Sequence, residues 1–166
     1  MEIAISLGSN LGDRLSHLRL ARALIEAIPA ARDITTSPVY ETEPVEVAVE
    51  HQALRFLNAI LLVQHAELHE FARCLWDIER QIGRPSARGK NEPRSLDLDI
   101  IYAGDVKVTD DELTVPHPRW AVREFVVRPL CDVRPDRVLP GETRTVREVL
   151  LSLPAGGGVV PFCGTL

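Results

Sequence analysis

The sequence has few cysteines and no long apolar run, which argues against a disulfide-rich, zinc-binding or membrane-spanning protein. Its three cysteines are too few and too widely spaced for a disulfide framework or a zinc site, which favours a reducing compartment. No apolar stretch approaches the ~20 residues that a membrane-spanning helix needs. The first residues also lack a basic segment followed by an apolar one. We therefore expect a cytoplasmic protein with no membrane partner.

The sequence also lacks an excess of basic residues and any phosphate-binding glycine loop. The 19 Lys and Arg residues against 24 Asp and Glu give a net charge of −5, whereas nucleic-acid-binding proteins usually carry a strong basic excess. We therefore expect no nucleic-acid partner. Neither a Walker A motif nor Gly-x-Gly-x-x-Gly occurs, and the glycine-containing segment 8–13 matches neither. If a nucleotide binds, another device must hold its phosphates.

The length and apolar content predict one globular domain over residues 1–166, which we expect to be a monomer. Periodicity predicts strands at 2–7, 33–41, 56–64 and 97–102, and helices at about 11–28 and 67–82. Ser9 and Asn10 are candidate N-caps; alternatively, their turn offers backbone amides or the Asn10 side-chain amide to a ligand. Pro38 favours an edge strand. The order βαββαβ predicts an α+β, ferredoxin-like sheet with helices packed on it. Residues 97–108 should form a hairpin, and short C-terminal helices should lie near 120–130 and 145–151.

Two acidic residues on the last core strand are the most informative feature. Asp97 and Asp99 alternate with apolar residues, so their side chains project from the same face of the strand. A pair of adjacent carboxylates suits Mg²⁺, which shares its shell with substrate phosphates. The alternative is the solvated face of an amphipathic strand. Because Asp is a poor strand former, two in succession favour a ligand.

Basic residues flank this acidic pair on both sides. The loop 84–93 contains Arg84, Arg88 and Lys90, and Arg94 follows it directly. This loop either binds phosphate or is a solvated surface loop. On the other side His117 lies between two prolines, which favours a fixed orientation, and Arg123 follows. Guanidinium forks and an imidazole together would bind phosphates. The sequence therefore predicts a metal–phosphate site.

A flat heterocycle is the second predicted ligand. Phe56 and Asn58 share one face of the third strand, and an amide on an apolar strand needs a polar partner. A planar ring with polar edges would satisfy both side chains. Glu79 lies near the start of the basic loop, where it is either part of the site or a solvent-facing helical acid.

Six ordered motifs resemble those of the 6-hydroxymethyl-7,8-dihydropterin pyrophosphokinase family. The resemblance covers the chain to about residue 150, which makes it far more specific than the acidic pair alone. The motifs are Ile5-Ser6-Leu7-Gly8-Ser9-Asn10-Leu11-Gly12-Asp13, Tyr40-Glu41-Thr42, Phe56-Leu57-Asn58, Ile78-Glu79 with Gly83-Arg84, Pro93-Arg94-Ser95-Leu96-Asp97-Leu98-Asp99, and Leu113-Thr114-Val115-Pro116-His117.

The resemblance implies a ferredoxin-like transferase of folate biosynthesis that moves pyrophosphate from ATP to the pterin hydroxymethyl group and releases AMP. It also implies a role for each matching residue. Asp97 and Asp99 would hold two Mg²⁺ ions. The phosphates would contact Arg84, Arg94, His117 and Arg123. ATP would also be contacted by Glu79, Thr114 and the backbone near Ile100. The pterin ring would lie between Phe56 and Phe125, with its edge bonded by Asn58, Thr42, Pro44 and Val45.

Other functions and one conformational change also follow from the residues. A non-catalytic ferredoxin-like binding module would need no acidic pair. Another Mg²⁺-dependent transferase on the same scaffold would differ in whether AMP, ADP or pyrophosphate leaves. From its composition we expect the segment 84–93 to order when ATP and the pterin bind.

Overall fold

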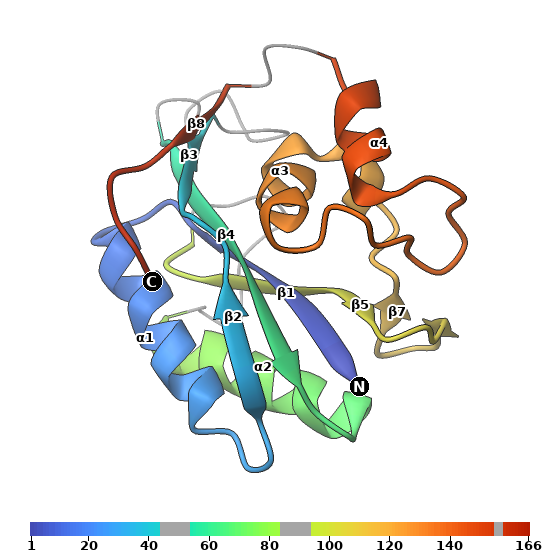
Figure 1. Cartoon of the computed structure of the whole chain (residues 1–166). Helices are drawn as coiled ribbons and strands as arrows, with labels where there is room; N and C mark the ends of the chain where they lie inside the picture. Colours follow the sequence, from blue (N-terminus) through green and yellow to red (C-terminus); the bar gives the residue numbers. More distant parts are fainter. Residues whose placement is uncertain (44–53, 84–93, 155–157) are drawn as a thin grey trace.

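The computed structural model of the chain is a mixed α/β structure, with an antiparallel sheet between two pairs of helices (Figure 1). It describes residues 1–43, 54–83, 94–154 and 158–166. Within these ranges the elements are β1 (Glu2–Ser9), α1 (Arg14–Glu26), β2 (Arg32–Thr36), β3 (Tyr40–Thr42), β4 (Phe56–Gln64), α2 (Leu68–Ile82), β5 (Asp97–Ala103), β6 (Val108–Thr109), β7 (Thr114–Val115), the 3₁₀ turn η2 (Trp120–Val122), α3 (Glu124–Val133), α4 (Val146–Ser152) and β8 (Val159–Pro161).

The two most apolar strands, β1 and β4, form the centre of the sheet. Its strand order is β5-β1-β4-β3-β8, with β2 also paired to β4, and every one of these pairs is antiparallel. β1 and β4 pair from Glu2 opposite Gln64 to Ser9 opposite Leu57. Among the described residues, β5 pairs with β1 alone in this sheet, so no described strand pairs with the outer edge of the strand that carries the acidic pair.

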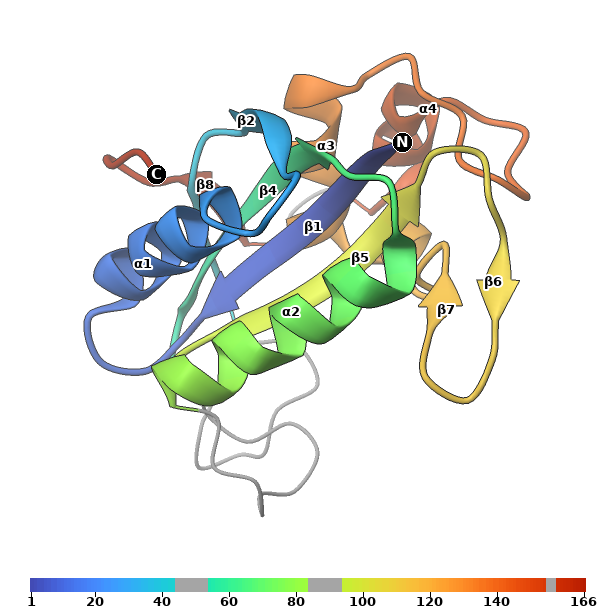
Figure 2. The same ribbon diagram turned by 90° about the horizontal axis from the view of Figure 1, so that it is seen from below.

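Alternate side chains of the central strands belong to two separate apolar cores on opposite faces of the sheet. Ile3, Ile5 and Leu7 of β1 pack under α1 and α2, whereas Ala4 packs with the other core under α3 and α4. Figure 2 shows the two pairs of helices on opposite faces of the sheet. Each fully buried Leu or Ile stabilises the fold by about 1.5–3 kcal/mol, so both faces hold the sheet firmly. A sheet fixed on both faces is a rigid support for side chains at the ends of its strands.

The first helix begins later than the periodicity predicts. Gly12 has a φ of 65°, and Asp13 then caps α1, accepting hydrogen bonds from the Ser16 amide at 3.1 Å and the Ser16 hydroxyl at 2.8 Å. The prediction that Ser9 or Asn10 caps this helix is wrong, because the left-handed turn at Gly12 interrupts the chain before the helix starts. The predicted strand 56–64 is confirmed as β4, and α2 begins one residue later than predicted.

The predicted strand 33–41 is two strands. Ser37 separates β2 from β3, and its hydroxyl accepts a hydrogen bond from the Ile60 amide at 2.9 Å and donates one to the Pro38 carbonyl at 2.7 Å. Pro38 cannot donate to a ladder, which explains the interruption. The predicted edge position holds for β2, which among the described strands pairs with β4 alone. It is wrong for β3, because β8 pairs with β3 from Tyr40 opposite Pro161 to Thr42 opposite Val159. β8 was not predicted from the sequence.

The predicted hairpin between residues 97–102 and 106–108 is also wrong. β6 pairs with β7 instead, because Val108 and Thr109 lie opposite Val115 and Thr114 and are therefore not available to β5. The helix expected near 120–130 is divided into η2 and α3 at Arg123, which has an extended backbone. The last predicted helix is confirmed as α4, which begins with a capping box formed by Thr145 and Glu148.

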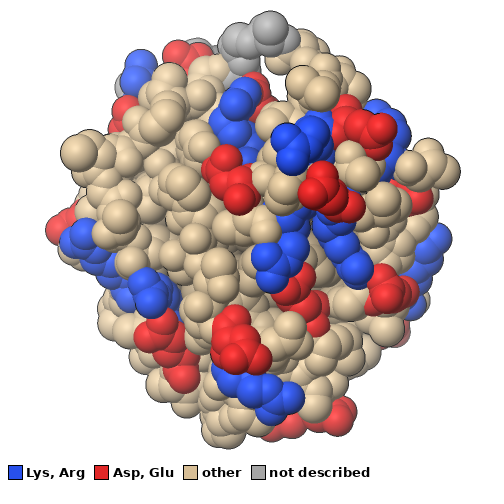
Figure 3. All heavy atoms as spheres, viewed as in Figure 1, with Lys and Arg blue, Asp and Glu red and all other residues tan. Residues whose placement is uncertain are grey.

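The face that carries α3 and α4 presents both signs of charge. Figure 3 shows Lys and Arg side chains there interspersed with Asp and Glu. Ion pairs account for part of this pattern, such as Arg128 Nε with Glu124 at 2.9 Å and Arg144 with Glu142 at 3.2 Å. In the described ranges, no helix is both long enough and apolar enough to cross a membrane.

The chain's two tyrosines should resist ionisation in the folded protein. Tyr40 donates to Asp132 at 2.8 Å and Tyr102 donates to Glu2 at 2.5 Å. Burial, and then the carboxylate partner, raise the pKa of Tyr40 to about 12 and raise the pKa of Tyr102 as well. Because each folded pKa lies above the unfolded value of about 10, the resulting stability is present below pH ~10 and is lost as the pH rises through the folded pKa.

We therefore expect little tyrosinate absorbance from the native protein at about pH 11, where urea-unfolded protein should be largely ionised. Parallel absorbance and circular dichroism titrations check this. Full tyrosine ionisation at that pH with the native dichroism retained would contradict the assignment.

Candidate functional site

One row of residues crosses four strands and sets the layout of the site. Tyr40 on β3 lies opposite Asn58 on β4, Asn58 opposite Gly8 on β1, and Gly8 opposite Asp97 on β5. Residues directly opposite in a sheet share a face. A Cβ at Gly8 would lie 3.2 Å from Asn58 Oδ1 and 3.8 Å from Asp97 Cβ. Glycine therefore leaves room between an amide and a carboxylate.

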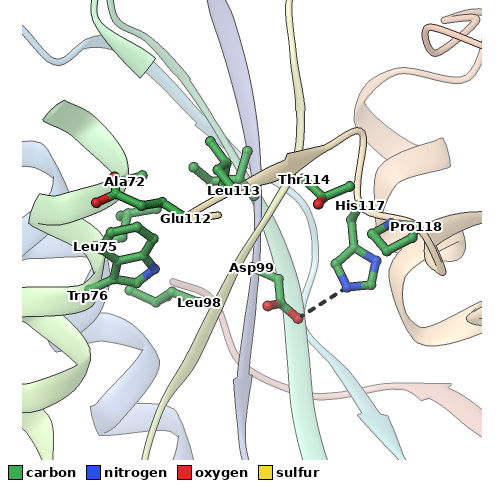
Figure 4. Close-up of a pocket in the computed structure, with 11 residues that line it drawn as sticks. Ala72, Leu75, Trp76, Leu98, Asp99, Glu112, Leu113, Thr114, His117 and Pro118 are labelled. Atoms are coloured by element: carbon green, nitrogen blue, oxygen red, sulfur yellow. Dashed lines mark ion pairs between the residues drawn. The ribbon is translucent and has the colours of Figure 1, made fainter. Parts of the chain in front are cut away.

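The two acidic side chains project from one face of β5, as predicted. The Asp97 side chain is 30% exposed and that of Asp99 is 42% exposed. Arg94 Nη1 lies 2.5 Å from Asp97 Oδ1. Asp99 Oδ2 lies 4.0 Å from His117 Nε2, the dashed line in Figure 4, and 3.9 Å from Arg123 Nη1. The structure therefore brings the predicted acids together with three predicted phosphate-binding residues.

His117 is held in one orientation by its own backbone and its neighbours. Its amide donates to the Ile101 carbonyl at 2.9 Å, and its Nδ1 accepts from the Arg119 amide at 3.1 Å. Burial, then the Arg123 and Arg119 charges, lower the pKa of His117 to about 4. The imidazole is therefore neutral near pH 7, and because Nδ1 accepts a hydrogen bond, Nε2 carries the proton. That N–H points toward Asp99 and can donate to an anion.

Arg123 is placed by the junction between η2 and α3. Its guanidinium carbon lies 5.5 Å from the centre of the Phe125 ring, within cation–π range. Its side chain is only 17% exposed. The aromatic contact and the burial both restrict the guanidinium, so its charge is fixed beside Asp99.

Two buried polar side chains hold the backbone of this region. Glu79 is 2% exposed, and its Oε1 accepts a hydrogen bond of 2.7 Å from the amide of Leu98, the residue between the two acids. The side-chain oxygen Oδ1 of Asn10 accepts a hydrogen bond from the backbone amide of Arg94 at 2.8 Å, and the backbone amide of Asn10 donates one to the Arg94 carbonyl at 3.2 Å. The solvent-facing alternative for Glu79 is therefore wrong. Its predicted contact with ATP stays a prediction.

The predicted heterocycle site is present in part. Asn58 Nδ2 donates to Thr42 Oγ1 at 2.7 Å, and both side chains are buried. Phe56 lies opposite Thr42 and is half-buried, as is Phe125 on α3. The stacking of a ring between Phe56 and Phe125 stays a prediction. Three other predicted site residues, Arg84, Pro44 and Val45, lie outside the described residues, as does the predicted ordering of 84–93.

A cavity of about 220 Å³ adjoins the acidic pair, between α2, β5 and the segment 112–118 (Figure 4). Ile100 and Thr114, both predicted to contact ATP, line it together with Asp99 and His117. The rest of its lining was not predicted from the sequence, and consists of Ala72, Leu75, Trp76, Leu98, Glu112, Leu113 and Pro118. Of these residues, Trp76 alone could have been recognised from the sequence as a candidate site residue. It is a large apolar side chain that lies beside the apolar stripe of its helix and not on it.

The outer edge of β5 offers backbone groups to this cavity. The Leu98 amide bonds to Glu79 rather than to β1. In an antiparallel strand the residues two apart share this direction, so the N–H and C=O groups of Ile100 also point to the outer edge. Ile100 lines the cavity, and its backbone donor and acceptor therefore face the space where a ligand would lie.

The donor set at Asp97 and Asp99 fits a metal shared with phosphates. Among the described residues, no His, Cys, Asp or Glu joins the pair in a group of three or more that could hold a metal. Mg²⁺ commonly uses one or two carboxylates and completes its shell with water and substrate phosphates. The neighbouring Arg94, His117 and Arg123 would receive the same phosphates.

Comparisons with known sequences all point to one family. The profile of the 7,8-dihydro-6-hydroxymethylpterin-pyrophosphokinase (HPPK) family matches residues 4–135. The 2-amino-4-hydroxy-6-hydroxymethyldihydropteridine pyrophosphokinase of Methylorubrum extorquens is 34% identical over 155 residues, which cover 92% of this chain and 94% of that protein. The folic acid synthesis protein fol1 of Schizosaccharomyces pombe is 34% identical over 154 residues, covering 92% of this chain. The chain spans only 20% of fol1 and 32% of a similar bifunctional protein from Arabidopsis thaliana.

Solved structures support the fold. A crystal structure of Plasmodium falciparum HPPK-DHPS matches with a TM-score of 0.66 at 15% identity, covering 90% of this chain and 43% of the other. At this identity the similarity concerns the fold alone.

Proposed function

Because the chain belongs to the 7,8-dihydro-6-hydroxymethylpterin-pyrophosphokinase family, we propose that it transfers pyrophosphate from ATP to the hydroxymethyl group of 6-hydroxymethyl-7,8-dihydropterin, releasing AMP. The reaction belongs to folate biosynthesis. The observation that carries the proposal is the row Asn58, Gly8 and Asp97, which sets a buried amide and a metal-type carboxylate on one face of the sheet.

The amide end of this row suits the pterin. Asn58 and Thr42 already form a buried polar pair, and Asn58 Oδ1 faces the gap at Gly8. A pterin edge carries both hydrogen-bond donors and acceptors, so it would complement this pair. Phe56 and Phe125 would hold the two faces of the ring by stacking. The hydroxymethyl group would then point along the row toward Asp97.

The cavity beside β5 suits ATP. Its polar end carries Asp99 and His117, with Arg123 adjacent, and its other side carries Ala72, Leu75 and Trp76 beside Glu112. The Ile100 backbone offers one donor and one acceptor to an adenine edge, and Thr114 adds a hydroxyl. The triphosphate would lie at the charged end, next to the pterin hydroxymethyl group.

The chain's own residues would accelerate the transfer mainly by positioning the substrates and neutralising charge. Asp97 and Asp99 would hold two Mg²⁺ ions, which when bound would neutralise charge on the ATP phosphates. Arg94, Arg123 and the neutral His117 would donate hydrogen bonds to the phosphate oxygens that gain charge as the pterin hydroxymethyl oxygen bonds to the β-phosphorus and AMP leaves with the bridging oxygen. Preorganised donors of this kind lower the barrier without a strong base.

The remaining finer points are proposals of the same kind. The strand order β5-β1-β4 with β2 and β3 on β4 supports a ferredoxin-like core. We also propose that residues 1–166 act as one domain, as a monomer, in the cytoplasm.

The decisive experiment is a product assay. Purified protein is incubated with ATP, Mg²⁺ and 6-hydroxymethyl-7,8-dihydropterin, and the nucleotides are separated by chromatography. We expect AMP that forms only when the pterin is present, together with a pterin diphosphate. ADP in its place would identify another transferase on this scaffold. No turnover, with an active control enzyme in the same buffer, would favour a binding module.

A further inference from the structure

The cavity beside β5 has charged groups at one end and apolar side chains of α2 at the other. Asp99 and His117 lie at the charged end, within 4.0 Å of each other. Figure 4 shows Ala72, Leu75 and Trp76 of α2 on the opposite side, together with Glu112, whose carboxylate pairs with Arg73 at 3.3 Å. A nucleotide has the same polarity, with an anionic phosphate chain and a flat, weakly polar base. Its phosphates therefore belong beside His117 and Arg123, and its base belongs beside α2.

Trp76 supplies the one indole ring among the described residues that line this cavity. It lies next to Leu75 of the buried stripe of α2 and is only partly buried itself, so part of its ring is left available. An aromatic ring binds any nucleobase through stacking, since every base has a π-face. The backbone of Ile100, at the edge of β5, is then left to recognise the edge of the base.

We propose that Trp76 is a binding residue for the nucleobase of ATP, in direct contact with the ring. This inference rests on the proposed function, because it takes ATP to be the occupant of the cavity. Trp76 provides affinity for the base and has no part in the chemical step.

Substitutions at Trp76 separate this role from simple packing. Trp76→Phe keeps an aromatic face, and Trp76→Leu removes it. Ile78→Val is the matched control, because Ile78 is buried on the same helix but does not line the cavity. Calorimetric titrations use Mg²⁺ with ATP, and Mg²⁺ with inorganic tripolyphosphate, which has no base. The pterin is omitted so that no transfer occurs.

We expect Trp76→Leu to bind ATP about fivefold to a hundredfold more weakly, since stacking on one base has this value. Trp76→Phe should stay within about threefold of the wild type, because it retains the π-face. Tripolyphosphate should bind alike to the wild type, both Trp76 variants and Ile78→Val. In turnover assays the Trp76→Leu defect should appear in the KM for ATP and not in kcat.

Fluorescence gives a second readout. In Trp120→Phe, which replaces the buried tryptophan of the other core, Trp76 is the sole tryptophan. Its emission should change saturably with ATP and not with tripolyphosphate.

Three outcomes would overturn the proposal. The first is wild-type ATP affinity in Trp76→Leu, and the second is an equal loss of ATP and tripolyphosphate, which would show a structural role. The third is a wild-type protein that binds no ATP, which would overturn the proposed function as well.

Discussion

Replacing Asp97 or Asp99 with asparagine is expected to lower turnover by at least a hundredfold to a thousandfold while the fold persists. Each substitution removes a carboxylate charge from a surface-accessible strand face and leaves its shape unchanged. A metal held by these carboxylates would stabilise developing phosphate charge by several kcal/mol, and about 3–4 kcal/mol corresponds to this loss of rate. Because neither side chain belongs to an apolar core, the thermal midpoint should change little.

The measurement is the kcat for pterin-dependent AMP release in each variant, at saturating ATP and over a range of Mg²⁺ concentrations. Asp136→Asn is the matched control, because Asp136 is 85% exposed and lies 3.6 Å from Arg147, away from the site. The control should keep wild-type turnover. Unchanged turnover in Asp97→Asn or Asp99→Asn would rule out the metal assignment, whatever their stability.

Replacing Arg123 with alanine is expected to lower kcat by about a hundredfold to a thousandfold, the usual effect of removing one preorganised donor from a charged transition state. The guanidinium is largely buried, contacts the Phe125 ring and lies 3.9 Å from Asp99. It is therefore already fixed in place, and its charge is applied in a partly desolvated site. Arg123→Lys should recover only part of the loss, because an ammonium lacks the planar fork.

Separate determination of kcat and KM for ATP tests this role. A donor that acts in the transition state changes kcat more than KM, whereas a ground-state contact raises KM. Arg147→Ala on α4 is the control, as its side chain is exposed and makes a long ion pair with Asp136. Full restoration of kcat in Arg123→Lys would show that charge alone is needed. Wild-type kcat in Arg123→Ala would contradict the assignment.

The features that the sequence could predict were those set by local periodicity. Two-residue alternation placed Asp97 and Asp99 on one strand face, and an unbroken apolar run predicted β4 with its correct bounds. The errors arose where a turn or a pairing partner decides the path of the chain. The left-handed turn at Gly12 delayed the start of α1, and the pairing of β6 with β7 replaced the predicted hairpin. Neither can be inferred from the hydrophobic pattern.

The candidate site was harder to predict wherever it depends on long-range pairing. Gly8 matters because β1 sets it between Asn58 and Asp97, which no local pattern reveals. Glu79 occupies an ordinary helical position, and only the packing of α2 on β5 carries its carboxylate to the Leu98 amide. The roles of Arg84, Pro44 and Val45 stay predictions, since these residues lie outside the described ranges.

The outer edge of β5, with which no described strand pairs, has a consequence for self-association. An exposed edge strand is a template on which a second molecule can add a strand. In this protein the Leu98 amide is engaged by Glu79. The register of β5 on β1 shifts between Ile100 and Tyr102, and the carbonyl of the intervening Ile101 accepts from the His117 amide. The groups left for a ligand are those of Ile100, inside the cavity. The same backbone edge that would otherwise promote aggregation is thus shielded by side chains and loops, and its remaining part becomes a surface for recognising a small molecule.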